Sequence, residues 1–363
     1  MSEIREKLTT ATSGVINRKP ITGPAAWYGR TLTGSDEWIY RLSEPDIAEI
    51  EAAVAGIRHR GLAMTEMTKD AFHLPHLGPV LEDIQREVLG GRGFVLFRDV
   101  PVERYTKQEA AIAYLGIGLH FGWPVSQNAK GHLLGHVRDI GLDPTNPNHR
   151  IYGTNARQQF HTDSCDIVGL LCLRPAFEGG RSSIASSVTI YNEMLDARPD
   201  LVTVLERPFF VDRKGEIPAG KGPYYELPVF NHFAGYLTTI YAREFIDCAQ
   251  RFDEVPRLTT EQVEAMDVLD ALAAREDIRL DMDLSPGDIQ FLHNHQILHA
   301  RTAFKDYPEP ERKRHMLRLW LAPPSGRPLP PAFAERYGTI EVGTRRGGIT
   351  VPGMQLCVPL DPE

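Results

Sequence analysis

The chain has 363 residues, 42% of them hydrophobic and 24% charged, with a formal net charge of −8. This is the composition of a globular protein with a sizeable core, and the lack of a long basic tract argues against a binder of duplex nucleic acid, which needs a concentrated positive face. No signal-peptide core follows Met1, and the strongest apolar stretch, residues 167–173, is too short to span a membrane as a helix. Four cysteines without a CxxC pair argue against a disulfide framework or a thiolate zinc site. We therefore expect a cytoplasmic protein with no membrane partner.

Two helices are predicted in the first third of the chain. Ser43 is a candidate N-cap with Pro45 in the first turn, and apolar residues recur at helical spacing from there to Gly61. A second helix is predicted from Leu77 to Leu89, where two glycines end it. We expect these helices to form an outer layer.

Short strands with Gly and Pro punctuation dominate the rest of the chain. They are predicted at residues 93–98, 167–173, 235–240, 288–292 and 316–321. A helical insert is predicted from Thr260 to Ala274. Strands that follow mostly N-terminal helices predict a mainly β fold with flanking helices, a β-sandwich or jelly roll.

We interpret the whole chain, residues 1–363, as a single domain. Residues 1–92 would form the helical N-terminal layer, and residues 93–322 the core with its helical insert. Residues 323–363 are expected to be a C-terminal tail packed on that core.

A short motif in the middle of the chain pairs a histidine with a carboxylate. In an extended segment residues i and i+2 point to the same side, so His161 and Asp163 can bind one metal ion together. They supply two of the three ligands of the facial triad of non-haem iron enzymes, and a second histidine must complete it. Three protein ligands leave positions on the metal open for a cosubstrate and dioxygen. Alone, His-x-Asp is a weak signal, because it is also typical of a surface pair at a strand end.

The second histidine is expected between residues 291 and 299, after a Ser-Pro-Gly turn. His293, His295 and His299 compete for this role. The spacing of His295 and His299 resembles a helical zinc motif, but Gln296 stands where the catalytic glutamate is needed, and the turn indicates a strand. We interpret His293 and His295 as packing or supporting residues.

The segment from Arg314 to Leu321 alternates in side-chain character. Arg314 and Arg318 share one face with Met316 and Trp320, and leucines lie on the other. A strand with one solvated face would explain the pattern, and so would a strand whose arginines face a pocket and bind carboxylates. The metal motif favours the pocket, because 2-oxoglutarate would bring a distal carboxylate that needs a partner.

Together these residues resemble the TauD/TfdA-type family of Fe(II)/2-oxoglutarate dioxygenases, which includes clavaminate synthase-like enzymes. The resemblance covers residues 93–321, and the joint occurrence of its motifs in order is specific. The motifs are His161-Thr162-Asp163, Gly179-Gly180-Arg181-Ser182, Asn294 to His299 with Ala300-Arg301-Thr302-Ala303-Phe304, and Arg314-x-x-x-Arg318. The family implies a double-stranded β-helix, a distorted jelly roll with iron near one mouth.

The resemblance also implies roles for residues. The expected iron ligands are His161, Asp163 and His299. Arg314 would bind the distal carboxylate of 2-oxoglutarate, and Ser182 would lie near the same cosubstrate. Arg318 falls where relatives contact either the cosubstrate or an acidic substrate, so its role stays open.

The implied activity is oxidation of a small organic acid, amino acid or natural-product intermediate, using Fe(II), 2-oxoglutarate and dioxygen and releasing succinate and CO2. Hydroxylation is favoured over halogenation, because iron halogenases replace the carboxylate ligand and Asp163 is intact. Desaturation or ring closure would use the same residues. Two alternatives are a cupin-like metal-binding module without redox activity and a zinc hydrolase. Arg314 and Ser182 argue against the first, and the lack of an obvious general base argues against the second.

The expected substrate contacts are Arg157, Arg318, Gln127, Asn128 and Asn294. Arg157 precedes His161 by four residues, where relatives place substrate contacts, and the polar pair at 127 and 128 is typical of a loop that closes over a pocket. Asn294 is expected to orient groups near the iron. Two guanidinium groups near the iron favour an anionic substrate. We expect a small-molecule partner, no nucleic acid, and a possible homo-oligomer.

Overall fold

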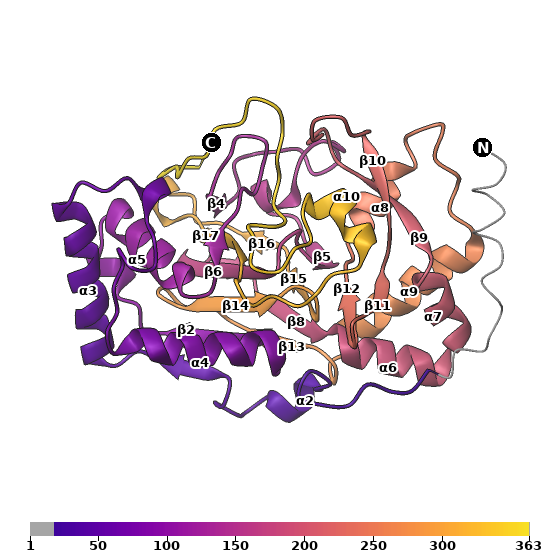
Figure 1. Ribbon diagram of the computed structural model, residues 1–363, viewed down its shortest axis with the longest axis horizontal. Coiled ribbons are helices and arrows are strands. Elements are labelled where there is room, and N and C mark those ends of the chain that lie inside the picture. Colours follow the sequence, from indigo (N-terminus) through magenta and orange to yellow (C-terminus); the bar gives the residue numbers. More distant parts are fainter. Residues whose placement is uncertain (1–17, 363) are drawn as a thin grey trace.

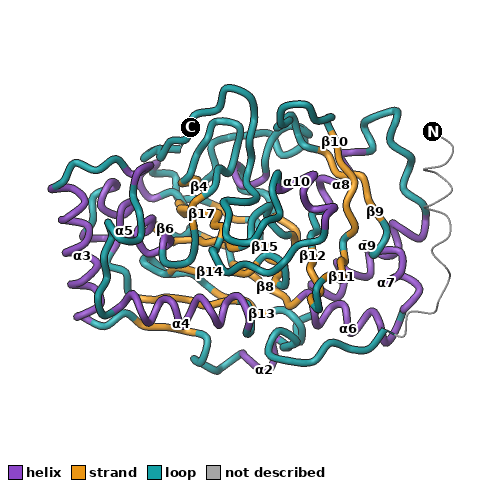
Figure 2. The backbone as a smooth tube through the Cα atoms, in the orientation of Figure 1, coloured by secondary structure: helices purple, strands orange, loops and turns teal. Residues whose placement is uncertain are grey.

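A computed structural model describes residues 18–362 of the chain (Figure 1). Strands occupy the middle of the molecule, and most helices lie toward its two ends (Figure 2). No helix in the described part of the chain is both long enough and apolar enough to cross a membrane.

A large sheet of seven strands forms one wall of the core. Its strands run in the order β1-β2-β14-β6-β17-β3, and β4 also pairs with β17. Their bounds are Ile39–Arg41 (β1), Phe94–Arg98 (β2), Ile289–His293 (β14), Ile167–Arg174 (β6), His315–Ala322 (β17), Trp123–Pro124 (β3) and Leu134–Val137 (β4). The pair β1–β2 is parallel and the other pairs are antiparallel.

A small antiparallel sheet forms the other wall, in the order β13-β8-β15-β5. Its strands are Leu280–Met282 (β13), Ser182–Ser186 (β8), Ile297–Arg301 (β15) and Gln158–His161 (β5). Three two-stranded ribbons surround it, formed by Pro208–Asp212 (β9) with Tyr224–Pro228 (β10), Phe230–Phe233 (β11) with Tyr236–Thr239 (β12), and Glu178–Gly179 (β7) with Phe304–Lys305 (β16).

The two sheets pack face to face through alternate side chains. Phe94, Leu292 and Trp320 from the large sheet join Ile184 and Ile297 from the small sheet in one buried cluster. This arrangement of two antiparallel walls is the jelly roll that the sequence predicts.

Helices cover the outer faces of both sheets. Glu44–His59 (α3), Leu77–Gly90 (α4) and Lys107–Leu119 (α5) pack on the large sheet, and Ser187–Ala197 (α6), Pro199–Leu205 (α7), Arg243–Ala249 (α8) and Thr260–Ala274 (α9) pack beside the small sheet. A four-residue helix, Gly29–Leu32 (α2), precedes β1. Helix α3 begins with the expected cap: Ser43 and Asp46 form a reciprocal capping box.

The predicted elements match the observed ones to within a few residues, and two boundaries between layers differ. The helical layer extends past residue 92, because the unpredicted helix α5 is buried from Ala110 to Leu119 against the large sheet. Residues before 92 also supply a strand, β1, to the core.

The segment after β17 crosses the front of the molecule, in yellow in Figure 1. It contains a short helix, Ala334–Tyr337 (α10), and sends Ile349 into the cluster between the sheets. Arg346 is 1% exposed and binds the carboxylate of Asp166, with its Nε donating to Oδ2 over 3.0 Å. The segment is therefore built into the structure beside the metal motif.

Candidate metal centre and adjoining cavities

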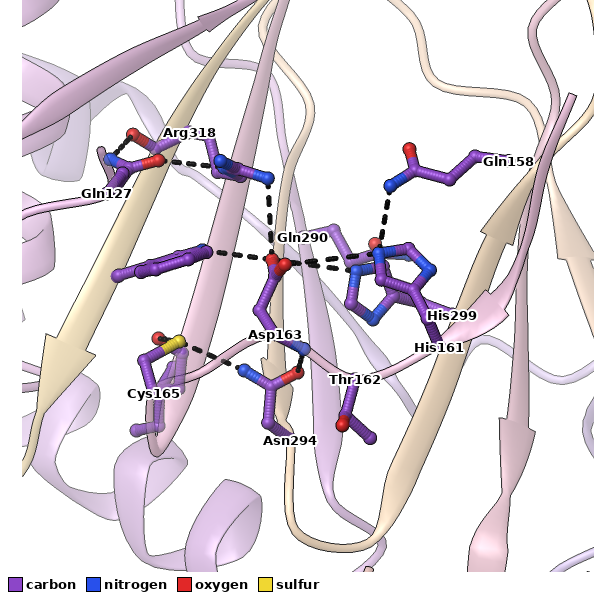
Figure 3. A network of polar contacts seen from close by, with 12 residues as sticks. Gln127, Gln158, His161, Thr162, Asp163, Cys165, Gln290, Asn294, His299 and Arg318 are labelled. Atoms are coloured by element: carbon purple, nitrogen blue, oxygen red, sulfur yellow. Dashed lines mark hydrogen bonds and ion pairs between the residues drawn. The ribbon is translucent and has the colours of Figure 1, made fainter. Parts of the chain in front are cut away.

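Three side chains converge at one end of the small sheet. His161 ends β5 and lies opposite His299 of β15, with the two imidazole centroids 4.1 Å apart. Asp163 follows two residues beyond the strand. Its Oδ1 lies 3.9 Å from His161 Nε2, and its Oδ2 lies 3.7 Å from His299 Nε2. One candidate ligand atom from each residue falls within 4.8 Å of the others (Figure 3).

Neighbouring groups hold the candidate ligands in place. The backbone N–H of Asp163 donates to Asn294 Oδ1 (3.1 Å), and Trp320 Nε1 donates to Asp163 Oδ2 (2.9 Å). His161 Nδ1 donates to the Gln159 carbonyl (2.8 Å), so Nε2 carries the lone pair that a metal would use, and in this structure that lone pair accepts from the Gln158 amide (2.9 Å). Figure 3 shows the carboxylate of Asp163 at the centre of these contacts.

The protonation states suit a divalent metal. Burial alone would raise the pKa of Asp163, but Arg318 and the two histidines lower it to about 2. Burial, followed by the neighbouring His161, lowers the pKa of His299 to about 3. At neutral pH one carboxylate and a neutral imidazole therefore face each other, as metal ligation requires. Two imidazoles and one carboxylate form the donor set of non-haem Fe(II).

The other two histidines of the segment point elsewhere. Strand β14 ends at His293, a turn carries His295, and β15 begins after it, so the spacing to His299 is not helical. His295 Nε2 lies 3.1 Å from Asp166 Oδ1, and His293 Nδ1 lies 3.3 Å from Arg327 Nη2. Both act as buried supporting residues, as the sequence indicates.

An inner cavity adjoins the histidines and is lined by two buried arginines, Arg314 and Arg301. The Nε and Nη1 atoms of both have no hydrogen-bond partner, and neither side chain forms an ion pair with any residue between 18 and 362. Burial lowers the pKa of Arg314 to about 10 and that of Arg301 to about 9. Both therefore stay charged at neutral pH, and unpaired buried cations of this kind need an anionic ligand.

The surroundings of Arg314 explain the double glycine of the sequence. Its guanidinium lies 5.1 Å from the ring centroid of Phe304, and that of Arg301 lies 4.9 Å from the same ring. Gly180 has a φ of +73°, and a Cβ there would lie 3.1 Å from Arg314 Nε. A larger residue at position 180 would crowd the guanidinium.

Ser182 lies in the same cavity, on β8 opposite Arg301. Its hydroxyl is within 3.5 Å of Gln290 Oε1. The structure thus brings together Ser182, Arg314 and the two histidines. It also places Arg301 there. The sequence analysis missed this residue, although Arg301 lies two residues after His299 on the same strand and residues at that spacing share a side.

A second, outer cavity opens on the other side of the metal cluster. It is lined by His161, Asp163, Trp320 and residues of β9, β10 and α8. Its empty volume is about 920 Å³, and that of the inner cavity about 480 Å³, in both cases including space open to solvent. Arg318 lines both cavities, and its Nη1 lies 3.6 Å from Asp163 Oδ2.

Other expected substrate contacts are placed differently. Gln127 is 1% exposed, accepts from Arg318 Nε (2.7 Å) and donates to the Arg318 carbonyl (2.7 Å), so it holds Arg318 and lines neither cavity. Asn128 closes its own loop through the backbone N–H of Lys130. Arg157 is exposed, lies just before β5 and lines neither cavity, whereas its neighbour Gln158 lines both. Asn294 accepts a hydrogen bond from the backbone of Asp163 and lines neither of these two cavities.

Comparison with known proteins agrees with this geometry. The family model described as taurine catabolism dioxygenase TauD, TfdA family, matches residues 60–320. The chain belongs to the TauD/TfdA family. It is therefore an Fe(II)- and 2-oxoglutarate-dependent dioxygenase, and the predicted enzyme class and cofactors are confirmed.

Two curated relatives are similar to this TauD/TfdA-family chain over most of its length. FR-33289 synthase of Streptomyces rubellomurinus is 32% identical over 89% of this chain and 96% of its own length. Taurine hydroxylase-like protein SAT17 of Stachybotrys chartarum is 32% identical over 82% of this chain and 81% of its own.

Solved structures of oxygenases share the fold. Asparagine oxygenase, solved with Fe(II), hydroxyasparagine and succinate, superposes with a TM-score of 0.62 at 17% identity, covering 78% of this chain and 93% of its own. Non-haem iron oxygenase OrfP, solved with Fe and alpha-ketoglutaric acid, gives 0.60 at 12% identity, with coverage of 78% and 93%. The predicted jelly-roll fold is confirmed by these likenesses.

The buried ion pair of Arg346 and Asp166 ties the C-terminal segment of this TauD/TfdA-family chain to the segment that carries Asp163. Arg346→Met should lower the free energy of unfolding by about 3–5 kcal/mol, because it leaves a buried carboxylate without its cation. Urea denaturation measures the loss. Arg345→Met removes an exposed charge next door and should change stability by less than about 0.5 kcal/mol. Equal stability of the two variants would contradict the prediction.

Proposed function

We propose that this oxygenase hydroxylates a small organic acid, amino acid or natural-product intermediate. The proposal rests on one observation. Two buried guanidinium groups that have no anionic partner lie beside a cluster of two histidines and one carboxylate. A dicarboxylate that reaches from the metal to these groups would satisfy both features.

In this proposal His161, Asp163 and His299 hold the iron. Arg314 binds the distal carboxylate of 2-oxoglutarate, with Arg301 as a second cation and the Ser182 hydroxyl as a donor. When bound, iron and 2-oxoglutarate activate dioxygen and oxidise a substrate C–H bond, with release of succinate and CO2. The protein itself supplies binding, orientation and a cavity shielded from water.

Arg318 lies between the two cavities and lines both of them. Its Nε is held by Gln127 and its Nη1 approaches Asp163, so its charge is directed at the metal ligand rather than free for a distant group. We propose that it orients Asp163 and borders the place where cosubstrate and substrate meet. Its stacking between Tyr152 (4.8 Å) and Trp320 (4.9 Å) keeps it there.

The names of relatives support a small substrate. Two more distant relatives, both 26% identical over about half of this chain, are uridine-5'-phosphate dioxygenases. Together with FR-33289 synthase and the asparagine oxygenase of similar fold, they are named for small molecules. Since Asp163 occupies its ligand position, hydroxylation is preferred to halogenation, and desaturation or ring closure would use the same residues.

The experiment that tests the function measures succinate. Purified protein is incubated with Fe(II), 2-oxoglutarate and a panel of small acids and amino acids, and products are analysed by mass for a gain of oxygen or a loss of hydrogen. Succinate formation stimulated by one compound, with that compound modified, supports the proposal. Metal binding without any succinate would favour a cupin-like module, and hydrolysis products with Zn(II) would favour a hydrolase.

Ser182 should contribute less to cosubstrate binding than the arginines. We expect Ser182→Ala to raise the KM for 2-oxoglutarate by about 5-fold, which corresponds to about 1 kcal/mol for one neutral hydrogen bond. Steady-state succinate formation at varied 2-oxoglutarate measures this. Ser183→Ala is the control, because that hydroxyl binds Asp281 (2.6 Å) instead of the cavity. An unchanged KM in Ser182→Ala would remove the residue from the site.

Two features of cellular context remain proposals. We propose a cytoplasmic location, because the four cysteines form no disulfide within residues 18–362. We also propose that the partner is a small molecule rather than a nucleic acid or membrane, on the basis of the two cavities beside the candidate metal ligands. Homo-oligomerisation stays a prediction.

A further inference from the structure

One wall of the outer cavity lies across the cavity from the candidate metal ligands. This wall comes from β9 and the loop after it, β10, α8, the C-terminal segment and the turn before β5. Its charged members are Arg150, Asp212, Arg213, Glu216, Glu244 and Arg336. The family model ends at residue 320, so Arg336 lies outside the part of the chain that defines the family. Arg336 is thus the one charged residue of this wall that the family model does not cover.

The acidic groups of the wall all have cationic partners. Asp212 pairs with Arg251 (2.8 Å), and Glu244 pairs with the ammonium of Lys214. Glu216 pairs with Arg150. Within each pair the two charges neutralise each other, so no carboxylate on the wall is without a countercharge.

Arg336 differs from the other cations of the wall. Within residues 18–362 it forms no ion pair. Its Nη1 donates to the carbonyl of Gly348 (3.0 Å), and its guanidinium has the neutral phenol of Tyr225 as a hydrogen-bonding neighbour. Its neighbour Arg213 is instead bound to Glu335 (2.6 Å) and to the Gly222 carbonyl (3.1 Å). One positive charge is therefore left uncompensated at the cavity, in a protein whose net charge is −8.

The effect of this charge on its neighbours agrees with the geometry. Burial, and after it the like charge of Arg336, lower the pKa of Arg213. Burial raises the pKa of Tyr225, and the charges of Arg336 and Arg213 oppose that rise. The phenol of Tyr225 and the guanidinium of Arg336 thus share one corner of the cavity, with a hydroxyl donor beside a cation.

We propose that Arg336 is a substrate-binding residue that anchors an oxyanion, a carboxylate or a phosphoryl group, at the end of the substrate opposite the oxidised carbon. The inference rests on the proposed function, and it names the substrate class: small acids whose anionic group and reacting C–H bond lie at opposite ends. Arg336 also lines a hollow on the surface next to the outer cavity, so an entering anion meets it on the way in. Arg318, whose charge is directed at Asp163, does not take this role.

The test uses two probes of the same shape, pentanoate and its neutral counterpart pentanamide. The full chain is loaded with Mn(II), which does not carry out the dioxygen chemistry, and with saturating 2-oxoglutarate, so that the inner cavity is filled. Binding is measured by calorimetry and by ligand-observed NMR. We expect pentanoate to bind at least about 10-fold more tightly than pentanamide, as a hydrogen bond to a charged group implies.

Variants at one position then isolate the residue. Arg336→Gln should weaken pentanoate about 10- to 100-fold and leave pentanamide unchanged. Arg336→Lys should restore part of the preference, and Arg345→Gln, an exposed arginine nine residues on, should have no effect. In all variants 2-oxoglutarate binding should be unchanged, because Arg336 does not line the inner cavity.

The outcomes separate this inference from the proposed function. If the native protein binds 2-oxoglutarate but does not distinguish the two probes, or if Arg336→Gln keeps the native preference, the anion site is wrong and the function stands. If pentanoate does not bind up to the solubility of its salt, the anion site is also overturned. If the native protein binds no 2-oxoglutarate and forms no succinate, the proposed function fails, while an Arg336-dependent preference for pentanoate would still support the anion site.

Discussion

His161→Ala, Asp163→Ala and His299→Ala should each abolish Fe(II)-dependent formation of succinate while the fold persists. Each side chain borders a cavity, with exposed fractions of 13%, 8% and 10%, so truncation leaves the packed clusters between sheets and helices intact. Removing a group that only supports a ligand costs about 10–100-fold in metal affinity. Loss of a ligand itself should cost at least about 100-fold. Equilibrium dialysis with metal analysis measures the affinity, and circular dichroism checks the fold.

His295 provides the matched control, because it lies four residues before His299 and its imidazole faces Asp166 instead of the cluster. His295→Ala should lower thermal stability, since it takes a partner from a buried carboxylate, and should keep Fe(II) affinity within about 10-fold of native. If His299→Ala bound iron and supported turnover and His295→Ala did not, the assignment of the third ligand would be wrong. If all four variants bound iron normally, the cluster would not be the metal centre.

Local patterns in the sequence predicted two groupings that the structure contains, His161 beside Asp163 and Arg318 beside Trp320 on β17. The role of His161 and Asp163 as iron ligands stays a prediction. Residues two apart on an extended segment share a side, and this rule places Arg318 and Trp320 together on the face toward the small sheet. The same rule applied to β15 would have found Arg301, which stands two residues after His299. It was missed because the motif was used only to recognise the family.

Contacts between distant segments could not be derived in this way. Gln127 was expected over a pocket because it follows a Gly-Trp-Pro turn, yet its amide is used up by Arg318, which is 191 residues away in sequence. Arg336 and Arg346 lie in a segment predicted as a tail. Nothing in their local sequence indicates that one reaches a cavity and the other a buried carboxylate near the metal motif.

The position of Arg157 shows the same limit at short range. It precedes His161 by four residues, and an extended backbone would put the two on one side. The chain before β5 is instead a single turn at Ile151–Gly153 followed by irregular backbone, and Arg157 is exposed. Spacing predicts a shared face only where the strand is continuous.

Arg314→Leu should weaken 2-oxoglutarate binding strongly and at the same time leave the ligand-free protein as stable as native or more so. Losing one partner of a buried, charge-assisted pair costs about 2–5 kcal/mol, and we expect the lower part of this range because Arg301 keeps a second cation in the cavity. A loss of about 2 kcal/mol raises the apparent dissociation constant about 30-fold. Calorimetry with Mn(II)-loaded protein measures it directly.

The expected stability of the Arg314→Leu variant follows from the lack of an anionic partner for the Arg314 guanidinium. Without a ligand, Arg314 is a buried cation whose Nε and Nη1 have no acceptor, and a leucine at the same place removes that cost. The thermal midpoint of the ligand-free variant should therefore not fall, whereas the increase that 2-oxoglutarate gives the native protein should shrink with the lost affinity. Arg312→Leu is the control: this exposed arginine lies two residues before Arg314 and stacks on Tyr307, and its loss should change neither quantity. If Arg314→Leu bound 2-oxoglutarate as tightly as the native protein, the guanidinium would have to serve packing alone, and the distal carboxylate would belong to Arg301.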